Sequence, residues 1–187
     1  IIVPDFRLEK LLGKNVLLVE RFDRSENQMR IPFLSAMSML GASDGEVRSY
    51  LEIAESLMEY GACPGRDLKN LWRRIVFNIM ISNLDDHLRN HGFLYDGPAG
   101  WRLSPIYDLE PTPLHVKARY LQTNINENDS TASLKLAYEV IDEFGIKISE
   151  ARAIVKDVVR SVKGWDKDAV RFLSLYFLSR DYQVGEV

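Results

Sequence analysis

The chain has 187 residues, a formal net charge of -3, 46% hydrophobic residues and 27% charged residues. These values are typical of a soluble globular protein, and no apolar run reaches the roughly 18 residues that a membrane span requires. Because the charge gives no basic field, direct binding to nucleic acid is disfavoured.

The first part of the chain predicts a β-hairpin. Residues 7–12 and 16–20 are β-prone runs, and Gly13-Lys14-Asn15 between them is a turn sequence. The second run is the more apolar, so we expect it to be a buried strand. The sequence begins at Ile1 without an initiator methionine, in strand-like material. We therefore interpret it as a fragment of a longer protein.

The charged stretch Glu20-Arg21-Phe22-Asp23-Arg24 follows the second strand directly. One interpretation is a solvated strand exit. The other is a hinge between two lobes that binds a nucleotide. In that case backbone groups of the stretch would bond to adenine, Phe22 would offer a flat apolar surface, and Asp23 would accept a hydrogen bond from ribose.

From Phe33 onward the pattern predicts helices. A short helix over 33–40 ends at Gly41, and Ser43 followed by Glu46 matches a capping box that opens a second helix, which ends at Gly61.

A linker over 62–66 contains Cys63, the single cysteine, which excludes an internal disulfide and a multi-cysteine zinc site. A single cysteine is consistent with a reducing cytoplasm, so we expect a cytoplasmic protein. Asp67 is the expected cap of the next helix. That helix has apolar residues repeating at three and four positions, which predicts a core helix whose carboxyl end delivers Asn83 and Asp85 into a loop. Its apolar positions are Leu68, Leu71, Trp72, Ile75, Val76, Ile79 and Met80.

A second hairpin is predicted from the runs 92–95 and 101–103, joined by a turn-rich segment. It would carry the chain away and return it, so that Asp108 can lie beside Asn90. Residues 117–133 are mostly polar and predict a loop.

The remaining sequence predicts further helices. One covers 134–145, one begins behind Ser149 as its cap and ends at Gly164, and the last covers about 168–182. The expected fold is α+β and mainly helical.

The loop after the core helix carries the residues most suited to chemistry. Phosphoryl transfer from ATP needs a carboxylate near the attacking hydroxyl and oxygen ligands for Mg²⁺. Asp85, Asn90 five residues later, and Asp108 beyond a short hairpin have the order found in protein kinases. Each of them could instead be a cap or turn former.

The neighbours of these residues leave several roles open. His87 and Arg89 could contact phosphate, or His87 could hold the loop through a backbone hydrogen bond. We expect Asp86 to face solvent or Arg89. His91 and His115 are expected to be ordinary polar residues rather than ligands.

A metal-dependent phosphohydrolase built on Asp85, Asp86 and His87 is an alternative. It is disfavoured because such sites usually need several spaced histidines.

Several segments resemble the carboxyl-terminal portion of the HipA family of serine/threonine kinase toxins. These segments, in chain order, are residues 16–24, the Asn-x-Asp-x-His-x-x-Asn run at 83–90, Trp101 to Pro105, Tyr107-Asp108 and Ser149 to Arg152. The resemblance covers essentially the whole chain.

The resemblance implies a role for each site residue. Asp85 would be the catalytic base, and Asn90 and Asp108 would hold Mg²⁺. The nucleotide would contact a further set, Glu20, Arg21, Phe22, Asp23, His87, Arg89 and Tyr107. Residues 1–32 would be the remnant of an amino-terminal lobe with the hinge, and residues 33–187 a kinase-like helical lobe.

The resemblance also implies substrates and partners. The substrates would be ATP and a serine or threonine of a protein, with aminoacyl-tRNA synthetases as family targets. The usual partner is a HipB-like DNA-binding antitoxin, through which the kinase meets DNA indirectly.

The chain departs from the family in one respect. The phosphate-binding loop and the nucleotide-binding lysine of such kinases precede the strand that starts here near Val16, and Lys10 and Lys14 are poor substitutes. We therefore expect little or no kinase activity from this polypeptide alone. The alternative function is a non-catalytic module that binds an antitoxin through its helical faces.

Overall fold

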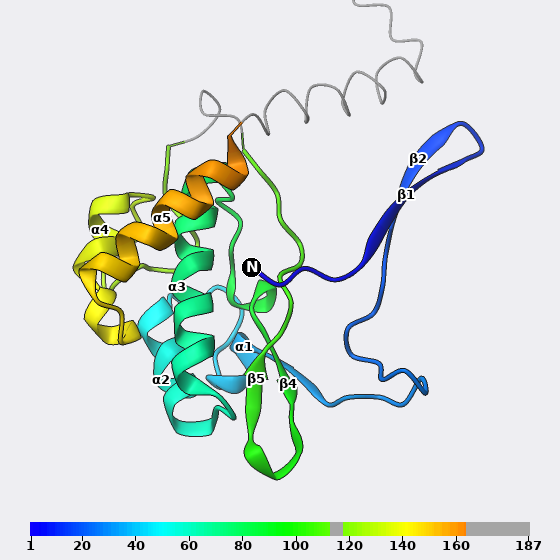
Figure 1. Cartoon of the computed structure of the whole chain (residues 1–187), viewed down its shortest axis with the longest axis horizontal. Coiled ribbons are helices and arrows are strands. Elements are labelled where there is room, and N and C mark those ends of the chain that lie inside the picture. The colour runs from blue at the N-terminus through cyan, green and yellow to red at the C-terminus, as the bar shows by residue number, and fades with distance from the viewer. Residues whose placement is uncertain (113–117, 164–187) are drawn as a thin grey trace, which may run out of the picture.

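The helix α3 (Pro64–Ile81) is the central element of a helical body, which Figure 1 shows. The helices α2 (Tyr50–Tyr60), α4 (Leu134–Glu139) and α5 (Ile148–Val162) pack against it. The structure, a computed structural model, describes residues 1–112 and 118–163. Its combination of helices with two small sheets confirms the expected mainly helical α+β class.

The core position predicted for α3 is confirmed. Trp72 is fully buried, and its indole Nε1–H donates to the carbonyl of Ala137 at 2.9 Å, which ties α3 to α4. The helix begins earlier than predicted, because Pro64 fits the first helical position. Asp67 therefore lies in the first turn rather than at the cap. It is buried and accepts the backbone N–H of Leu103 at 3.0 Å.

The second predicted hairpin is present as β4 (Gly92–Tyr95) and β5 (Trp101–Leu103), joined through the short 3-10 helix Gly97–Ala99. The helix predicted over 33–40 is wrong at its start. Phe33–Ser35 forms strand β3, which pairs antiparallel with β4, and only α1 (Ala36–Met39) is helical. These residues form a strand because the edge of β4 offers them hydrogen-bonding partners. The sequence did not reveal the strand, because three residues are too few to show a period.

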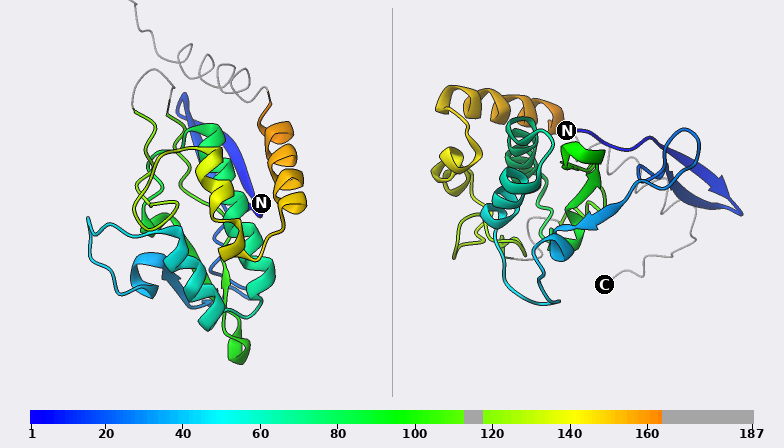
Figure 2. Two further views of the ribbon diagram at one scale, coloured as in Figure 1. Left: turned by 90° about the vertical axis from the view of Figure 1, so that its left-hand side faces the viewer. Right: turned by 90° about the horizontal axis from the view of Figure 1, so that it is seen from below.

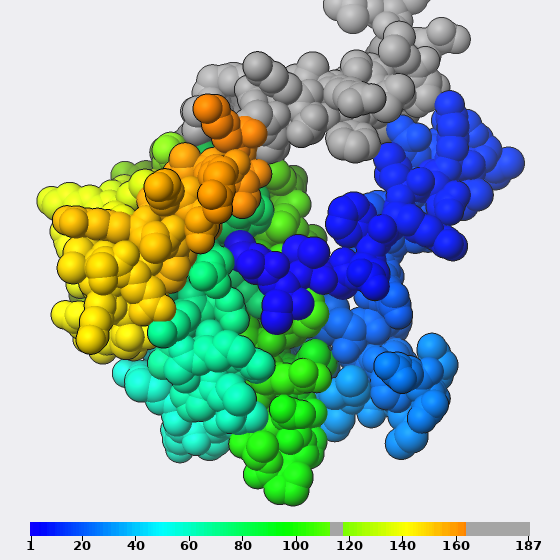
Figure 3. All heavy atoms as spheres, viewed as in Figure 1, coloured from blue at the N-terminus to red at the C-terminus, as the bar shows by residue number. Residues whose placement is uncertain are grey.

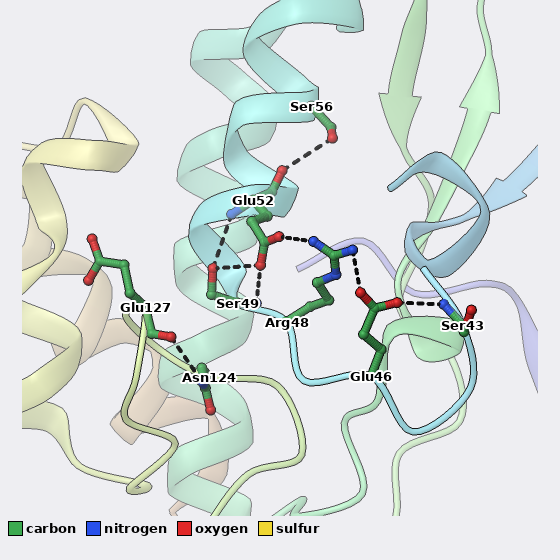
Figure 4. Close-up of polar contacts among 8 residues, drawn as sticks. All are labelled: Ser43, Glu46, Arg48, Ser49, Glu52, Ser56, Asn124 and Glu127. Atoms are coloured by element: carbon green, nitrogen blue, oxygen red, sulfur yellow. Dashed lines mark hydrogen bonds and ion pairs between the residues drawn. The ribbon is translucent and has the colours of Figure 1, made fainter. Parts of the chain in front are cut away.

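The beginning of α2 differs from the prediction. Ser49 caps it, with Ser49 accepting from the backbone of Glu52 and the Glu52 side chain accepting in return, as Figure 4 shows. The predicted capping box at Ser43 does not open a helix. Gly45, in what would be the first turn, has a φ of +80°, a left-handed conformation that a right-handed helix cannot contain.

The carboxyl-terminal helices follow the prediction in part, because the helix predicted over 134–145 is divided into α4 and a 3-10 helix. After α4, a short 3-10 helix over Ile141–Phe144 ends at Gly145, which has a φ of +62°. α5 begins at Ile148 behind Lys147, so Ser149 lies in its first turn and is not its cap. Within the described ranges no helix is long and apolar enough to cross a membrane. The predicted stop at Gly164, the helix over 168–182 and His115 lie outside the described residues.

The first hairpin, β1 (Phe6–Leu11) and β2 (Lys14–Val19), projects away from the helical body (Figures 1 and 2). The positive φ values of Leu12 (49°) and Gly13 (78°) are those of a tight type I′ turn. The expectation that β2 is buried is wrong within the described structure. Leu17 is 59% exposed, and Figure 3 shows the hairpin atoms standing apart from the body.

The polar segment over 118–133 is a loop, as predicted, but it is packed against α2. Leu121, Thr123 and Ile125 are buried, whereas Tyr120 is exposed. The backbone N–H of Tyr50, the first residue of α2, donates to the carbonyl of Asn124 at 2.8 Å. The loop also lies beside the residues that follow α3, because the hydroxyl of Thr123 donates to the carbonyl of Asp86 at 2.6 Å.

Candidate active site

The carboxyl end of α3 positions the loop that carries the candidate residues. Ser82 adopts a left-handed conformation with a φ of +55°, which ends the helix and turns the chain. Asn83 is buried. Its amide nitrogen donates to Asn78 Oδ1 at 3.2 Å, and its Oδ1 accepts the backbone N–H of Glu110 at 3.1 Å. The helix end is therefore bonded to the segment that follows Asp108.

Asp85 and Asn90 bracket a tight loop that closes with the 3-10 helix Leu88–Asn90. Asn90 is buried, and its Nδ2 donates to the main-chain carbonyl of Asp85 at 3.0 Å. Because Asn90 uses its nitrogen in this bond, its carbonyl oxygen is left as a candidate metal ligand. The carboxylate of Asp85 accepts a hydrogen bond from the side-chain amide of Gln122.

Asp86 is a buried junction, so the expectation that it faces solvent or Arg89 is wrong. Its carboxylate accepts from the hydroxyl of Tyr50 and from the backbone N–H groups of Gln122 at 2.9 Å and Thr123 at 3.4 Å. Burial raises the pKa of Asp86 to about 7, although these hydrogen bonds lower it. Burial also raises the pKa of Tyr50 well above its ordinary value.

The two histidines of the loop have different surroundings. His91 is buried, with its Nε2 3.2 Å from the carbonyl of Asp86 and its ring edge-on to Tyr50, and burial lowers its pKa to about 3. It is a neutral structural residue. His87 has a buried Nδ1 without a hydrogen-bond partner among the described residues. A contact between His87 and phosphate stays a prediction.

Tyr107 joins the second segment of the site to the first. Its hydroxyl donates to the carbonyl of Arg89 at 2.6 Å, across 18 positions of sequence. The hairpin thus returns the chain to the loop, as predicted. Burial raises the pKa of Tyr107 to about 12, which keeps the hydroxyl a donor. Asp108 follows, exposed and with a φ of +55°.

The predicted hinge contacts the site through one aromatic side chain. The ring centroid of Phe22 lies 5.5 Å from that of Tyr107 and 6.1 Å from that of Phe33. The backbone N–H of Glu20 donates to the carbonyl of Asp5 at 2.8 Å. Phe22 is therefore a residue of the predicted hinge that contacts Tyr107, which in turn bonds to the loop.

Three charged residues of the predicted hinge, Arg21, Asp23 and Arg24, bond to one another. Asp23 accepts from Arg21 at 2.6 Å and from Arg24 at 2.8 Å. The hydrogen bond from Arg21 lowers the pKa of Asp23 to about 2. The carboxylate is thus already engaged, and a ribose hydroxyl would have to compete with two arginines.

A pocket of about 440 Å³ lies on one side of the loop, lined by residues 43–48, 87–89 and 122–123 together with Met37. Arg48 shapes its rim by bonding to Glu46 at 2.6 Å and to Glu52 at 2.7 Å, as Figure 4 shows. Gln122 lines this pocket and also donates to Asp85. The predicted base Asp85 is therefore bonded to a lining residue of this pocket, although Asp85 does not itself line the pocket.

The described side chains bear on the choice of metal chemistry. Within residues 1–112 and 118–163, no three His, Cys, Asp or Glu side chains are grouped so that they could hold a metal ion. The phosphohydrolase alternative needs Asp86 as a ligand, yet its carboxylate is buried and accepts three hydrogen bonds. An amide oxygen from Asn90 with a carboxylate from Asp108 would instead be an oxygen-only set of the kind that Mg²⁺ prefers, and this assignment stays a prediction.

Several site residues were missed by the sequence analysis. Gln122 and Tyr50 come from other segments and carry no local signal. Asn78 had one, because it is a polar residue on the buried face of α3, one turn before the loop.

Comparison with known proteins gives consistent matches. The sequence profile of the family described as the HipA-like C-terminal domain matches residues 1–165. A Haemophilus influenzae protein named as a candidate kinase is 29% identical over 121 residues, which cover 57% of this chain and 35% of that protein. The candidate kinase Y4mE of Sinorhizobium fredii is 32% identical over 111 residues, covering 54% and 26% respectively.

A solved structure shares the fold. It is the Shewanella oneidensis complex of the toxin-antitoxin proteins HipA and HipB with operator DNA, and one of its chains matches with a TM-score of 0.71 at 19% identity. The match covers 86% of this chain and 43% of that one. The chain therefore spans less than half the length of these relatives.

Proposed function

The chain belongs to the HipA-like C-terminal domain family, and from this premise we propose that it forms the hinge and helical lobe of a Mg²⁺-dependent serine/threonine protein kinase. Such an enzyme transfers the γ-phosphoryl group of ATP to a hydroxyl of a protein. By resemblance to the family, the acceptors are aminoacyl-tRNA synthetases. The kinase names of two relatives agree with this reaction class.

The anchoring of the loop from Asp85 to Asn90 is the observation that carries the proposal. Phosphoryl transfer depends on positioning and on charge neutralisation, so its residues must be held on a rigid element. Here α3 ends in the loop, the Asn90 amide fixes the main chain at Asp85, and Gln122 orients the Asp85 carboxylate. Asp85 is then suited to accept the proton of the acceptor hydroxyl.

The nucleotide would lie between the hinge and the loop. Phe22 and Tyr107 offer neighbouring ring surfaces there. Asn90 and Asp108 are the residues that would hold Mg²⁺, which supplies neutralisation of the phosphate charge when bound. Arg89 and His87 are available for phosphate contacts, although Arg89 also forms an ion pair with Asp44.

The acceptor would reach Asp85 from the pocket bordered by Gln122. A segment of a protein could enter a space of about 440 Å³ with its hydroxyl towards the carboxylate. This arrangement separates the acceptor from the hinge side of the loop.

The metal part of the proposal is tested by linkage between ATP and Mg²⁺. In the full-length protein, ATP should raise the melting temperature more with Mg²⁺ than with a chelator, because a ligand that binds the folded state stabilises it. Asp108→Asn should lose the Mg²⁺-dependent part of this rise, whereas the surface variant Asp142→Asn should keep it. An Asp108→Asn protein with the full Mg²⁺ dependence would contradict the assignment.

The amino-terminal lobe enters the proposal as well. By resemblance to the family, a phosphate-binding loop and a nucleotide-binding lysine would complete the nucleotide site. We propose that kinase activity needs these two parts together with the residues described above.

The second candidate function is a non-catalytic module that binds a HipB-like antitoxin, which would also link this chain to DNA indirectly. The fold it shares with a HipA chain from a complex with HipB favours this candidate. Affinity for such an antitoxin that survives in an Asp85/Asp108 double variant of a protein without transfer activity would support it. An antitoxin-bound protein that is also an active kinase would show that both functions are present.

A further inference from the structure

A second cavity, of about 180 Å³, lies between α3, strand β5 and the first residues of the chain. Arg66, Arg74 and Arg102 all line it, together with a single carboxylate, Asp67. Neither Asp85 nor the two predicted metal ligands line this cavity. It is therefore separate from the proposed catalytic residues, although Phe22 of the hinge forms part of its wall.

Arg74 is the residue that makes this cavity unusual. It is 3% exposed and lies on the buried face of α3. One guanidinium nitrogen, Nη2, donates to the carbonyl of Ser104, while Nε and Nη1 have no partner among the described residues. Burial lowers the pKa of Arg74 to about 10, a value at which the group is still charged at neutral pH.

A buried cation of this kind is costly unless an anion accompanies it. No described Asp or Glu forms an ion pair with Arg74. Asp67, the carboxylate in the cavity wall, already accepts from Arg66 at 3.0 Å and from the backbone N–H of Leu103 at 3.0 Å. Its charge is therefore shared with another arginine.

Arg102 adds a second set of donors to the same wall. It lies on β5, opposite Leu94 of β4, and its buried Nε has no partner among the described residues. Three arginines against one aspartate leave the lining with an excess of two positive charges. Arg74 and Arg102 thus come from two elements and line one space, and each has a buried N–H group without a partner among the described residues.

We infer that this cavity binds an oxyanion of the phosphate or carboxylate class, held by Arg74 and Arg102. Guanidinium groups match these anions in geometry and charge, and such charge-assisted bonds are stronger than neutral ones. The inference goes beyond the proposed kinase function, because it needs neither ATP nor a metal ion. The oxyanion could be free in solution or be part of a larger molecule.

The test uses inorganic phosphate and, in a separate arm, acetate. The side-chain Nε–H signals of ¹⁵N-labelled arginine are followed by NMR in the full chain during each titration. The Arg74 and Arg102 signals should shift on saturable binding, and Arg74→Met or Arg102→Met should weaken that binding at least about tenfold. Response to phosphate alone or to acetate alone identifies which member of the class is bound.

Arg73→Met is the matched control. Arg73 directly precedes Arg74 on α3 and does not line the cavity. It donates to Asn70 at 2.9 Å. Arg73→Met should bind phosphate as the wild type does. If Arg74→Met fails to fold, Arg102→Met and the wild-type NMR titration still show whether the cavity binds the anion.

Two results would overturn the inference. One is an absence of any shift at Arg74 and Arg102 with either anion. The other is phosphate binding that Arg74→Met and Arg102→Met leave unchanged, which would assign the anion to another place such as the nucleotide site. The Mg²⁺-dependent stabilisation by ATP that Asp108→Asn should lose is measured separately, so the kinase proposal and this inference fail independently.

Discussion

The helical body buries its large apolar side chains, whereas the first hairpin exposes side chains of the same kind. Trp72 and Phe144 of the body are almost completely buried, whereas Phe6 and Leu17 of the hairpin are 67% and 59% exposed. A two-stranded hairpin alone is marginal in water, because it buries little apolar surface. The loop from Asp85 to Asn90 therefore follows a well-buried helical core, while the predicted hinge adjoins a hairpin whose apolar side chains are mostly exposed.

The polar contacts of the two regions differ in the same way. Asp86 is held by three hydrogen bonds inside the body, whereas Asp23 of the hinge is held by arginines near the surface. Exposed ion pairs contribute little to stability. The ring contacts of Phe22 with Tyr107 and Phe33 are among the links between the two regions. We infer that the loop from Asp85 to Asn90 is preformed and that the predicted hinge depends on further contacts.

Truncation of Trp72, in the core of the body, should have the largest effect on stability. Trp72→Ala removes a fully buried indole and its hydrogen bond to Ala137, so it should lower the free energy of unfolding by about 3–5 kcal/mol. Chemical denaturation followed by circular dichroism measures the loss. A loss below about 1 kcal/mol would mean that the body does not depend on α3 as described.

The buried carboxylate should give the body a pH signature. The folded pKa of Asp86, about 7, lies above its ordinary value of 3.8, so the folded state binds more protons between these values. The stability that Asp86 contributes is thus present below pH 3.8 and is lost as the pH rises through 7. Relative to Asp86→Asn, the wild type should lose at most about 1.4 kcal/mol per pH unit.

His91 acts in the opposite direction over much of the same range. Its folded pKa, about 3, lies below its ordinary value of 6.5, so its contribution is present above pH 6.5 and is lost as the pH falls through 3. The stability of Asp86→Asn should therefore rise with pH where that of the wild type is flatter. Unfolding curves measured from pH 4 to pH 8 test this, and parallel profiles would contradict the buried junction.

The smallest effect is expected in the hairpin. Leu17→Ala shortens a side chain that is 59% exposed, so the free energy of unfolding should change by less than about 0.5 kcal/mol. The same denaturation experiment measures it beside Trp72→Ala. A loss above about 2 kcal/mol in the 187-residue chain would show that β2 is buried in solution and would remove the contrast.

The sequence predicted the elements that carry a long periodic pattern or a clear turn signal. α3 was predicted because its apolar residues recur at helical spacing over several turns, and both hairpins were predicted from turn residues between short β-prone runs. β3 was not, because three residues carry no period and its partner lies far along the chain. The false capping box at Ser43 shows that such a motif also needs a helical first turn, which Gly45 prevents.

For the candidate site, the sequence indicated which residues to consider but only some of their contacts, and the roles of these residues stay predictions. The spacing of Asp85, Asn90 and Asp108 could be read from sequence, as could the return of the chain to Arg89. The burial of Asp86 could not, because neighbouring residues in a loop point in directions that tertiary contacts decide. Its partners Tyr50 and Gln122 are both 36 positions away.

Transfer of radiolabelled phosphate from ATP to a protein serine or threonine by the full-length protein tests the central claim most directly. The preformed loop predicts transfer by the wild type and by the surface variant Asp142→Asn. Asp85→Asn should lower the rate by about 10²- to 10⁴-fold, the usual contribution of a general base, while keeping a wild-type melting temperature. Undiminished transfer by a folded Asp85→Asn protein would contradict the assignment of Asp85 as the base.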